Sequence, residues 1–137
     1  MIRILALAGI ALALAGTTAA DSRTDRHGDS QKGVSDLDRA LAGRSPGTPQ
    51  NCIDPSFASG RQIIDGTTIL YRAGGRVWRN TLDSSCPGLT PDATLISESF
   101  GGQLCRGDRV RALERGSHIP GPWCRLGSFV PYAKVKP

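Results

Sequence analysis

Hydrophobic and polar positions after residue 60 follow the short runs and turns of a β-protein. In "RQIIDGTTILYR", residues 61–72, two runs of β-forming residues flank Asp65-Gly66. Asp-Gly between such runs is a strong hairpin signal. "AGGR" at residues 73–76 then turns the chain into "VWRNTL". These segments predict three antiparallel strands in a meander.

The rest of the C-terminal region continues this pattern less regularly. Residues rich in β-formers occupy 94–100, 108–115 and 124–135, with glycine, proline and aspartate between them. Long helical periodicity is absent from this part of the sequence. We therefore predict an all-β domain over residues 51–135, a small disulfide-stapled barrel or sandwich of five to six short antiparallel strands.

Residues 21–50 have a different character, because they are polar and almost free of aliphatic side chains. Such a composition buries too little apolar surface to offset the entropy of ordering the chain. We expect a polar tail or linker that contains one short helix over residues 36–42. Ser35 would cap this helix, and Leu37 and Leu41 would share the face that docks on the domain.

The first 20 residues have the three parts of a signal peptide. Arg3 precedes an apolar run over residues 4–15, and Thr18-Ala19-Ala20 supplies small residues for cleavage. The apolar run is too short for a comfortable membrane span, and no second long apolar stretch follows it. We expect a periplasmic or secreted protein that does not span the membrane after signal cleavage.

Four cysteines, Cys52, Cys86, Cys105 and Cys124, lie in the expected mature chain. In an oxidising compartment an even number of cysteines predicts two disulfides. The absence of any C-x-x-C pair argues against a zinc site or a thioredoxin-like redox site. Of the three possible pairings we expect Cys86–Cys105, at the edges of neighbouring strands, which leaves Cys52–Cys124 to join the first strand to the last.

Arg106-Gly107-Asp108 spells a tripeptide found in cell-adhesion ligands. It directly follows a cysteine and directly precedes a predicted strand. Glycine tolerates positive φ, and aspartate can accept a hydrogen bond from nearby backbone, so this dipeptide suits a tight turn. We predict a structural turn at this position.

Positive charge is concentrated in the predicted β-domain. The chain has a net charge of +5, and from residue 51 onward 11 basic residues outnumber 7 acidic ones. Strand alternation would place several arginines together, and others flank the second hairpin near Tyr71 and Trp78. The candidate anion-binding residues are Arg72, Arg79, Arg109, Arg111 and Arg115. Suitable partners are an anionic envelope component or another exported protein, and no nucleic acid is expected.

Catalytic signals are weak. His27 and His118 stand apart from any residue that would complete a base or a ligand set. No phosphate-binding loop or nucleophile motif is present, and the sequence indicates neither a cofactor nor a metal. Glu98 and Glu114 on predicted strands, or Asp108 in a turn, could serve a small secreted hydrolase or lyase. This enzyme is the alternative to a non-enzymatic module.

The motifs together resemble those of an uncharacterised group of small exported proteins of alphaproteobacteria. The shared features are an L-x-G-R-x-x-G-x-P-x-x-C-I entry starting at Leu41, the hairpin with "DGTTI", "CPGL", and "LCRGD". The resemblance covers residues 41–132 and implies a bacterial exported protein without implying an activity. The leading hypothesis is therefore an exported, non-enzymatic binding or envelope-associated module with a basic face.

Overall fold

The computed structural model describes residues 23–55 and 58–136 and consists mostly of β-strands. The predicted signal peptide, residues 1–20, lies outside the described residues. The elements in chain order are α1 (Arg23–Leu41), β1 (Arg44–Pro46), β2 (Cys52–Ile53), β3 (Ala58–Ile63), β4 (Thr68–Ala73), β5 (Arg76–Thr81), β6 (Thr94–Glu98), β7 (Leu104–Cys105), β8 (Arg109–Leu113), β9 (Cys124–Arg125) and β10 (Phe129–Lys134). All strand pairs are antiparallel, which confirms the predicted all-β class.

The strands form three sheets: a five-stranded sheet in the order β1-β10-β5-β4-β3, a three-stranded sheet β6-β8-β9, and the pair β2-β7. The predicted meander is the β3-β4-β5 part of the large sheet. At its first turn the Asp65 Oδ1 atom accepts hydrogen bonds from the backbone N–H and the hydroxyl of Thr67, both at 2.8 Å. At its second turn Gly74 and Gly75 have φ angles of 59° and 75°, which a two-residue hairpin turn requires.

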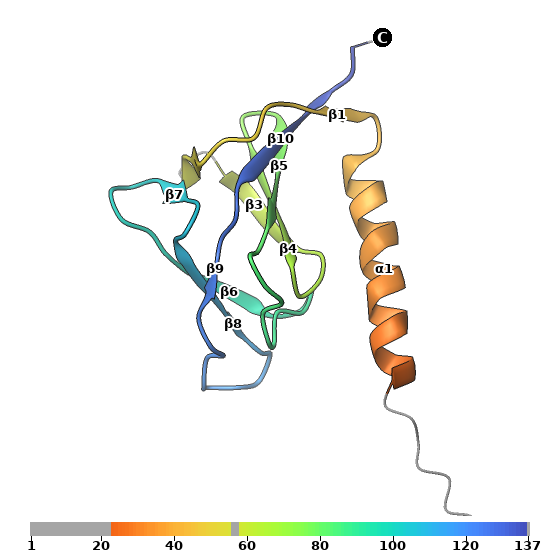
Figure 1. Cartoon of the computed structure of the whole chain (residues 1–137), viewed down its shortest axis with the longest axis vertical. Helices are drawn as coiled ribbons and strands as arrows, with labels where there is room; N and C mark the ends of the chain where they lie inside the picture. The colour runs from red at the N-terminus through yellow and green to blue at the C-terminus, as the bar shows by residue number, and fades with distance from the viewer. Residues whose placement is uncertain (1–22, 56–57, 137) are drawn as a thin grey trace, which may run out of the picture.

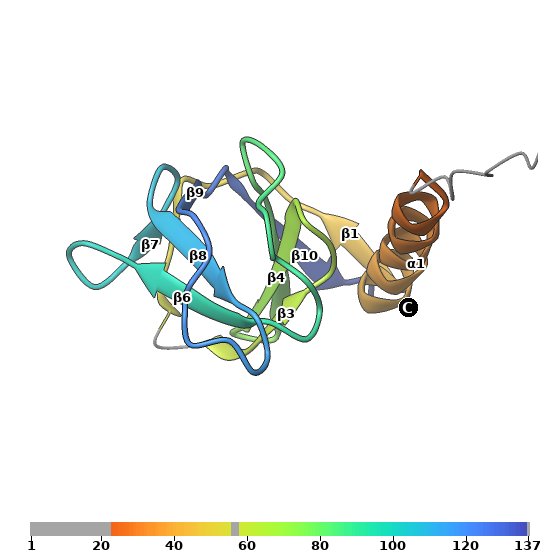
Figure 2. The same ribbon diagram turned by 90° about the horizontal axis from the view of Figure 1, so that it is seen from below.

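The main core lies between the five-stranded and the three-stranded sheets, which pack face to face (Figure 2). Alternate residues of β4, β5 and β10 point into it, and Tyr71 meets Phe129 edge to face with ring centroids 5.8 Å apart. The facing sheet contributes Leu95 and Val110. Trp123 is not part of this core and is partly exposed.

Helix α1 covers the opposite face of the large sheet, so the molecule has three layers (Figure 1). Leu37, Ala40 and Leu41 of the helix pack against a small second cluster around Leu70 and Val77. The helix begins at Arg23, well before the short helix predicted over residues 36–42. Leu37 and Leu41 pack against the domain as expected, whereas the turns of α1 before residue 36, which contribute no side chain to this cluster, were not predicted.

The segment after the helix also differs from the expected linker. Strand β1 pairs with β10, with Arg44 opposite Lys134 and Pro46 opposite Tyr132. Gly47 extends this contact, because its N–H donates to the Pro131 carbonyl at 2.7 Å. The region predicted as a tail therefore belongs to the large sheet and fixes the end of α1 beside it.

The disulfides join Cys52 to Cys105 and Cys86 to Cys124. Two disulfides are correct, but the expected pairing, Cys52–Cys124 and Cys86–Cys105, is wrong. Strand order explains the difference, because β2 lies beside β7 and places Cys52 directly opposite Cys105. Two disulfides are typical of proteins in oxidising compartments.

A buried polar contact joins β5 to the loop between β9 and β10. The Asn80 side-chain amide donates to the Gly127 carbonyl at 2.8 Å, and the Gly127 N–H donates to the Asn80 Oδ1 atom at 3.1 Å. Asn80 has no exposed surface. Gly127 has no room for a side chain, since a Cβ atom there would collide with the Thr81 carbonyl oxygen. This pair closes the large sheet against the start of the final strand.

Candidate binding surfaces

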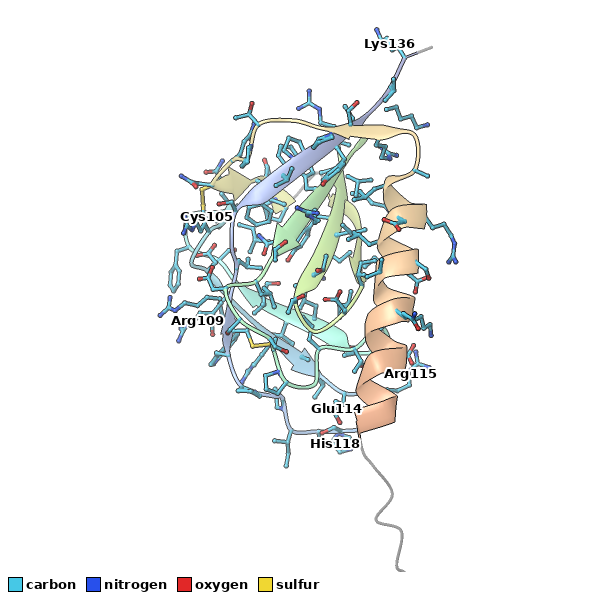
Figure 3. The ribbon with its side chains drawn as sticks, turned by 45° about the vertical axis from the view of Figure 1, so that its right-hand side comes forward. Cys105, Arg109, Glu114, Arg115, His118 and Lys136 are labelled. Carbon is cyan, nitrogen blue, oxygen red and sulfur yellow. A yellow bond between two sulfur atoms is a disulfide. The ribbon has the colours of Figure 1, made fainter. Side chains whose placement is uncertain are left out.

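The predicted anion-binding arginines lie in three separate places. Arg72 and Arg79 belong to the face of the large sheet that carries α1, and the Arg79 guanidinium carbon lies 5.7 Å from the centroid of the Tyr132 ring. Arg109 and Arg111 lie on the outer face of the three-stranded sheet. Arg115 lies in the turn after β8 and is far from Arg109 in Figure 3. The structure therefore divides the predicted patch.

Arg109 and Arg111 form one cluster with Trp123. They alternate along β8 with core residues, so both guanidinium groups face outward. Their guanidinium carbons lie 5.2 Å and 4.2 Å from the centroid of the Trp123 ring. These contacts are cation–π interactions, which hold the side chains flat on the sheet. No sequence pattern indicated this role of Trp123. The residue directly precedes β9, and only the pairing of β9 with β8 brings it beside these arginines.

The outer face of this sheet is only partly basic. Arg125 of β9 lies opposite Arg109 and donates to the Gly107 carbonyl at 3.1 Å. Glu98 of β6 forms a 2.6 Å ion pair with Arg109. Arg109 is thus neutralised and Arg125 has a backbone partner, while Arg111 contacts the Trp123 ring and its Nε atom makes no hydrogen bond to the described residues. The cluster is suited to stiffening the sheet more than to holding a free anion.

A second group of cationic side chains surrounds a hollow in the five-stranded sheet. The hollow has a volume of about 240 Å³ and lies where β1 and β10 meet the turn between β4 and β5. No carboxylate is among the described residues that line it. The four cationic side chains in its wall are Arg44, Arg72, Arg76 and Lys134.

Strand pairing brings these cations together although they are distant in the sequence. Arg44 and Lys134 are direct neighbours across β1 and β10, and Arg76 begins β5 just after the glycine turn. Arg44 donates to the carbonyls of Gly75 and Tyr132 at 3.3 and 3.4 Å, so it is held in position. Arg72 donates to the Gln62 side chain at 3.2 Å. Of the five predicted arginines only Arg72 lines the hollow, because the pairing of β1 with β10 could not be read from the sequence.

Glu98 and Glu114, the two strand carboxylates proposed for an enzyme, do not come together. Glu98 lies opposite Arg109 at one end of β8, and Glu114 follows the other end of that strand. The strand rise of about 3.4 Å per residue separates them by roughly 17 Å. Asp108 accepts a hydrogen bond from the Cys105 N–H at 2.8 Å. The geometry does not supply the pair of strand carboxylates that was proposed for the hydrolase or lyase alternative.

The Arg106-Gly107-Asp108 segment is a tight turn, as predicted. The Asp108 N–H donates to the Cys105 carbonyl at 3.0 Å, and Gly107 has a φ of 89°. The disulfide to Cys52 and the hydrogen bond from Gly107 N–H to the Leu126 carbonyl at 2.8 Å hold this turn against the domain. Its residues serve the connection between β7 and β8.

The remaining sequence candidates show no convergence. His118 is exposed in the loop after β8 (Figure 3), and His27 lies at the N-terminal end of α1. Within residues 23–55 and 58–136, no three histidine, cysteine, aspartate or glutamate side chains are placed to hold a metal ion. The one helix of that range is not long and apolar enough to cross a membrane.

Comparison of the chain with protein-family models, with curated proteins and with solved structures found no match. The resemblance to small exported alphaproteobacterial proteins therefore stays an expectation from the sequence motifs.

Proposed function

We propose that this chain is an exported binding module that holds an anionic group of an envelope component in the basic hollow. The observation that carries the proposal is the convergence of Arg44, Arg72, Arg76 and Lys134 on one cavity without a lining carboxylate. Neighbouring cations in a concave surface raise the local concentration of anions. The guanidinium groups of the arginines can also donate pairs of hydrogen bonds to phosphate or carboxylate oxygens.

The size of the hollow fits this role. About 240 Å³ corresponds to roughly eight water molecules at about 30 Å³ each. A phosphate or carboxylate group fits this space together with some of its hydration. Arg44 is positioned by two backbone carbonyls, so part of the site is preorganised before a ligand arrives. Export and a partner in the envelope rest on the signal-peptide pattern and on the two disulfides.

The test is a titration of the secreted protein with inorganic phosphate and with a phosphate-bearing envelope polymer. We expect saturable changes in the amide NMR signals of Gly74 and Gly75, which form the turn beside the hollow. The double variant Arg76→Gln/Lys134→Gln removes two exposed cations from the wall without removing the hydrogen bonds of Arg44. Its affinity should fall roughly tenfold or more, since charge-assisted hydrogen bonds contribute about 1.5–3 kcal/mol each.

The matched control is Arg115→Gln/Lys136→Gln, which removes the same charge from exposed positions outside the hollow. It should bind like the unmodified chain at equal salt concentration. Equal losses in the two variants would mean that net charge alone attracts the anion, and the hollow would lose its proposed role. Binding that survives in the hollow variant would have the same consequence.

A further inference from the structure

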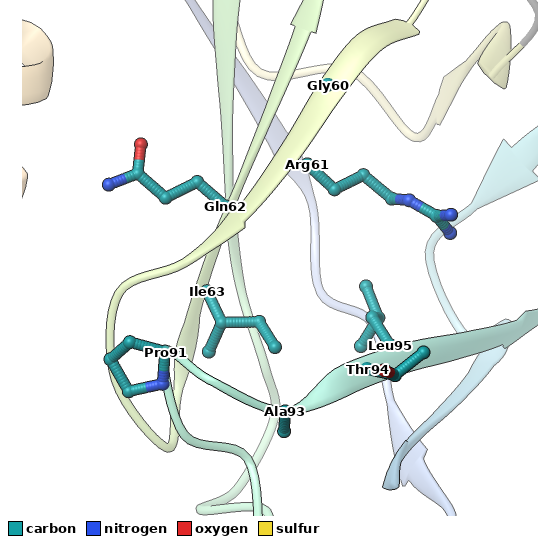
Figure 4. A pocket seen from close by; sticks show the side chains of 8 residues that line it. All are labelled: Gly60, Arg61, Gln62, Ile63, Pro91, Ala93, Thr94 and Leu95. Carbon is teal, nitrogen blue, oxygen red and sulfur yellow. The ribbon is translucent and has the colours of Figure 1, made fainter. Parts of the chain in front are cut away.

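A groove lies between β3 and β6, which are edge strands of the five-stranded and three-stranded sheets. It has a volume of about 500 Å³ and is lined by Ile63 and Arg61 of β3 and by Leu95 of β6, among others. Figure 4 shows the side chains of Ile63 and Leu95 between the two strands, and that of Gln62 on the other side of β3 from Arg61. Ile63 and Leu95, both core residues, give the floor of the groove its apolar part, while polar groups make up most of the remaining lining.

A smaller cavity of about 220 Å³ adjoins this groove and shares Arg61 with it. Tyr71, Ser97, Ser99 and Leu104 also line it. Its position follows from strand pairing, because Arg61 lies directly opposite Tyr71 on β4 and Ser97 lies two residues beyond Leu95 on β6. The cavity thus continues the groove along β3 and β6.

Two hydroxyl groups of this cavity have no partner. The Tyr71 hydroxyl and the Ser97 Oγ atom are buried and make no hydrogen bond to any residue that the structure describes. Tyr71 is only 1% exposed. A buried hydroxyl without a partner costs about 1–3 kcal/mol, so most native structures avoid it. Two such groups beside one cavity indicate that something from outside accepts or donates their hydrogen bonds.

The electrostatics of the cavity favour an anion. Burial raises the pKa of the Tyr71 hydroxyl well above its usual value, and the nearby Arg61 guanidinium opposes this rise only partly. Tyr71 therefore keeps its proton and acts as a hydrogen-bond donor. Arg61 adds a positive charge and a planar fork of N–H groups that matches a carboxylate. The donors and the charge together suit one carboxylate group.

We propose that Arg61, Tyr71 and Ser97 form a site for a carboxylate group whose apolar body lies in the groove between β3 and β6. Arg61 binds the carboxylate as an ion pair, and the hydroxyls of Tyr71 and Ser97 donate to its oxygens. The apolar body covers Ile63 and Leu95. An organic acid and the C-terminus of a peptide both carry this chemistry. This site is separate from the basic hollow.

The experiment is a titration of the full secreted chain followed by amide NMR. One arm uses hexanoate with hexanamide as its uncharged match, and the other uses an acetylated Ala-Val-Leu peptide with a free or an amidated C-terminus. We expect at least one acid to shift the amide signals of Arg61, Tyr71 and Ser97 saturably, while its amide does not. The arm that binds more tightly identifies the source of the carboxylate.

Three variants test the named residues. Arg61→Gln, Tyr71→Phe and Ser97→Ala should each weaken binding, with losses of roughly tenfold or more for Arg61→Gln and Tyr71→Phe. Arg115→Gln is the control, since it removes the same charge as Arg61→Gln from an exposed turn that lines neither cavity. Tyr71→Phe should leave the melting temperature of the free protein unchanged or higher, because it removes an unpartnered buried hydroxyl. That result separates a binding role from a structural one.

Two results would overturn the site. The first is the absence of any saturable shift with either acid at tens of millimolar, which would leave a cavity that holds water only. The second is a Tyr71→Phe protein that melts well below the unmodified chain, since the hydroxyl would then have a partner within the fold. Variants of the basic hollow should leave this titration unchanged, so the two proposals fail independently.

Discussion

Replacing Asn80 by alanine should be among the most destabilising single changes in this chain. Asn80 has no exposed surface, and its side chain makes two hydrogen bonds with the buried backbone of Gly127, at 2.8 and 3.1 Å. Alanine removes both and leaves the Gly127 N–H and carbonyl without partners. Unsatisfied buried groups cost about 1–3 kcal/mol each, so the free energy of unfolding should fall by about 3–4 kcal/mol.

The measurement is thermal and urea unfolding followed by circular dichroism. For a domain of this size about 1 kcal/mol corresponds to about 4–8 °C, so a loss of about 3 kcal/mol predicts a melting temperature lower by about 12–24 °C. Asn51→Ala is the control, because Asn51 is exposed, and it should change stability by less than about 0.5 kcal/mol.

A second variant tests which part of the amide matters. Asn80→Asp keeps an oxygen for the Gly127 N–H but places a carboxylate against the Gly127 carbonyl. It should be strongly destabilised at neutral pH and recover part of its stability in acid, where the protonated carboxyl can donate. A loss below about 1 kcal/mol for Asn80→Ala would refute the reasoning, because the two backbone groups would then have found other partners.

Two further outcomes follow from the disulfides and from Tyr71. The disulfides close segments with sequence separations of 53 and 38 residues, so replacing either pair by serine should lower the free energy of unfolding in urea by about 4 kcal/mol. Peptide mapping without reduction should find a Cys52–Cys105 peptide. A Cys52–Cys124 peptide would contradict the strand order. The raised pKa of Tyr71 means that the hydroxyl ionises on unfolding, so its ionisation does not affect the free energy of unfolding below about pH 10 and lowers it by about 1.4 kcal/mol per pH unit above that. In urea unfolding, the free energy of unfolding should fall less between pH 8 and pH 11 for Tyr71→Phe than for the unmodified chain. Equal falls in the two proteins would mean that the hydroxyl titrates in the folded state.

The sequence predicted the local parts of this fold well. Asp65-Gly66 and Gly74-Gly75 mark both turns of the meander because turn chemistry depends on the residues within the turn itself. The strand segments around Leu95 and Val110 were also predicted, since β-forming residues and intervening turns are visible along the chain. These features need no knowledge of distant partners.

Features that depend on distant partners were not predictable. Cys52 reaches Cys105 because β2 lies beside β7, and a two-residue strand has no recognisable pattern. Arg44 joins the basic hollow only through the pairing of β1 with β10. The length of α1 was missed because its turns before residue 36 are polar and carry no apolar stripe, and the residues that dock on the sheet, Leu37, Ala40 and Leu41, lie only at its end.

The connectivity of the disulfides has a consequence for how the chain matures. The four cysteines pair first with third and second with fourth, so the two closed segments overlap and neighbouring cysteines in the sequence are never joined. A chain that is oxidised in the order in which its cysteines emerge would first join Cys52 to Cys86, which is not a native bond. Reaching the native pairs then requires thiol–disulfide exchange. We therefore expect this protein to depend on a disulfide isomerase more than on an oxidase when it is produced, and to accumulate mispaired forms where only the oxidase is present.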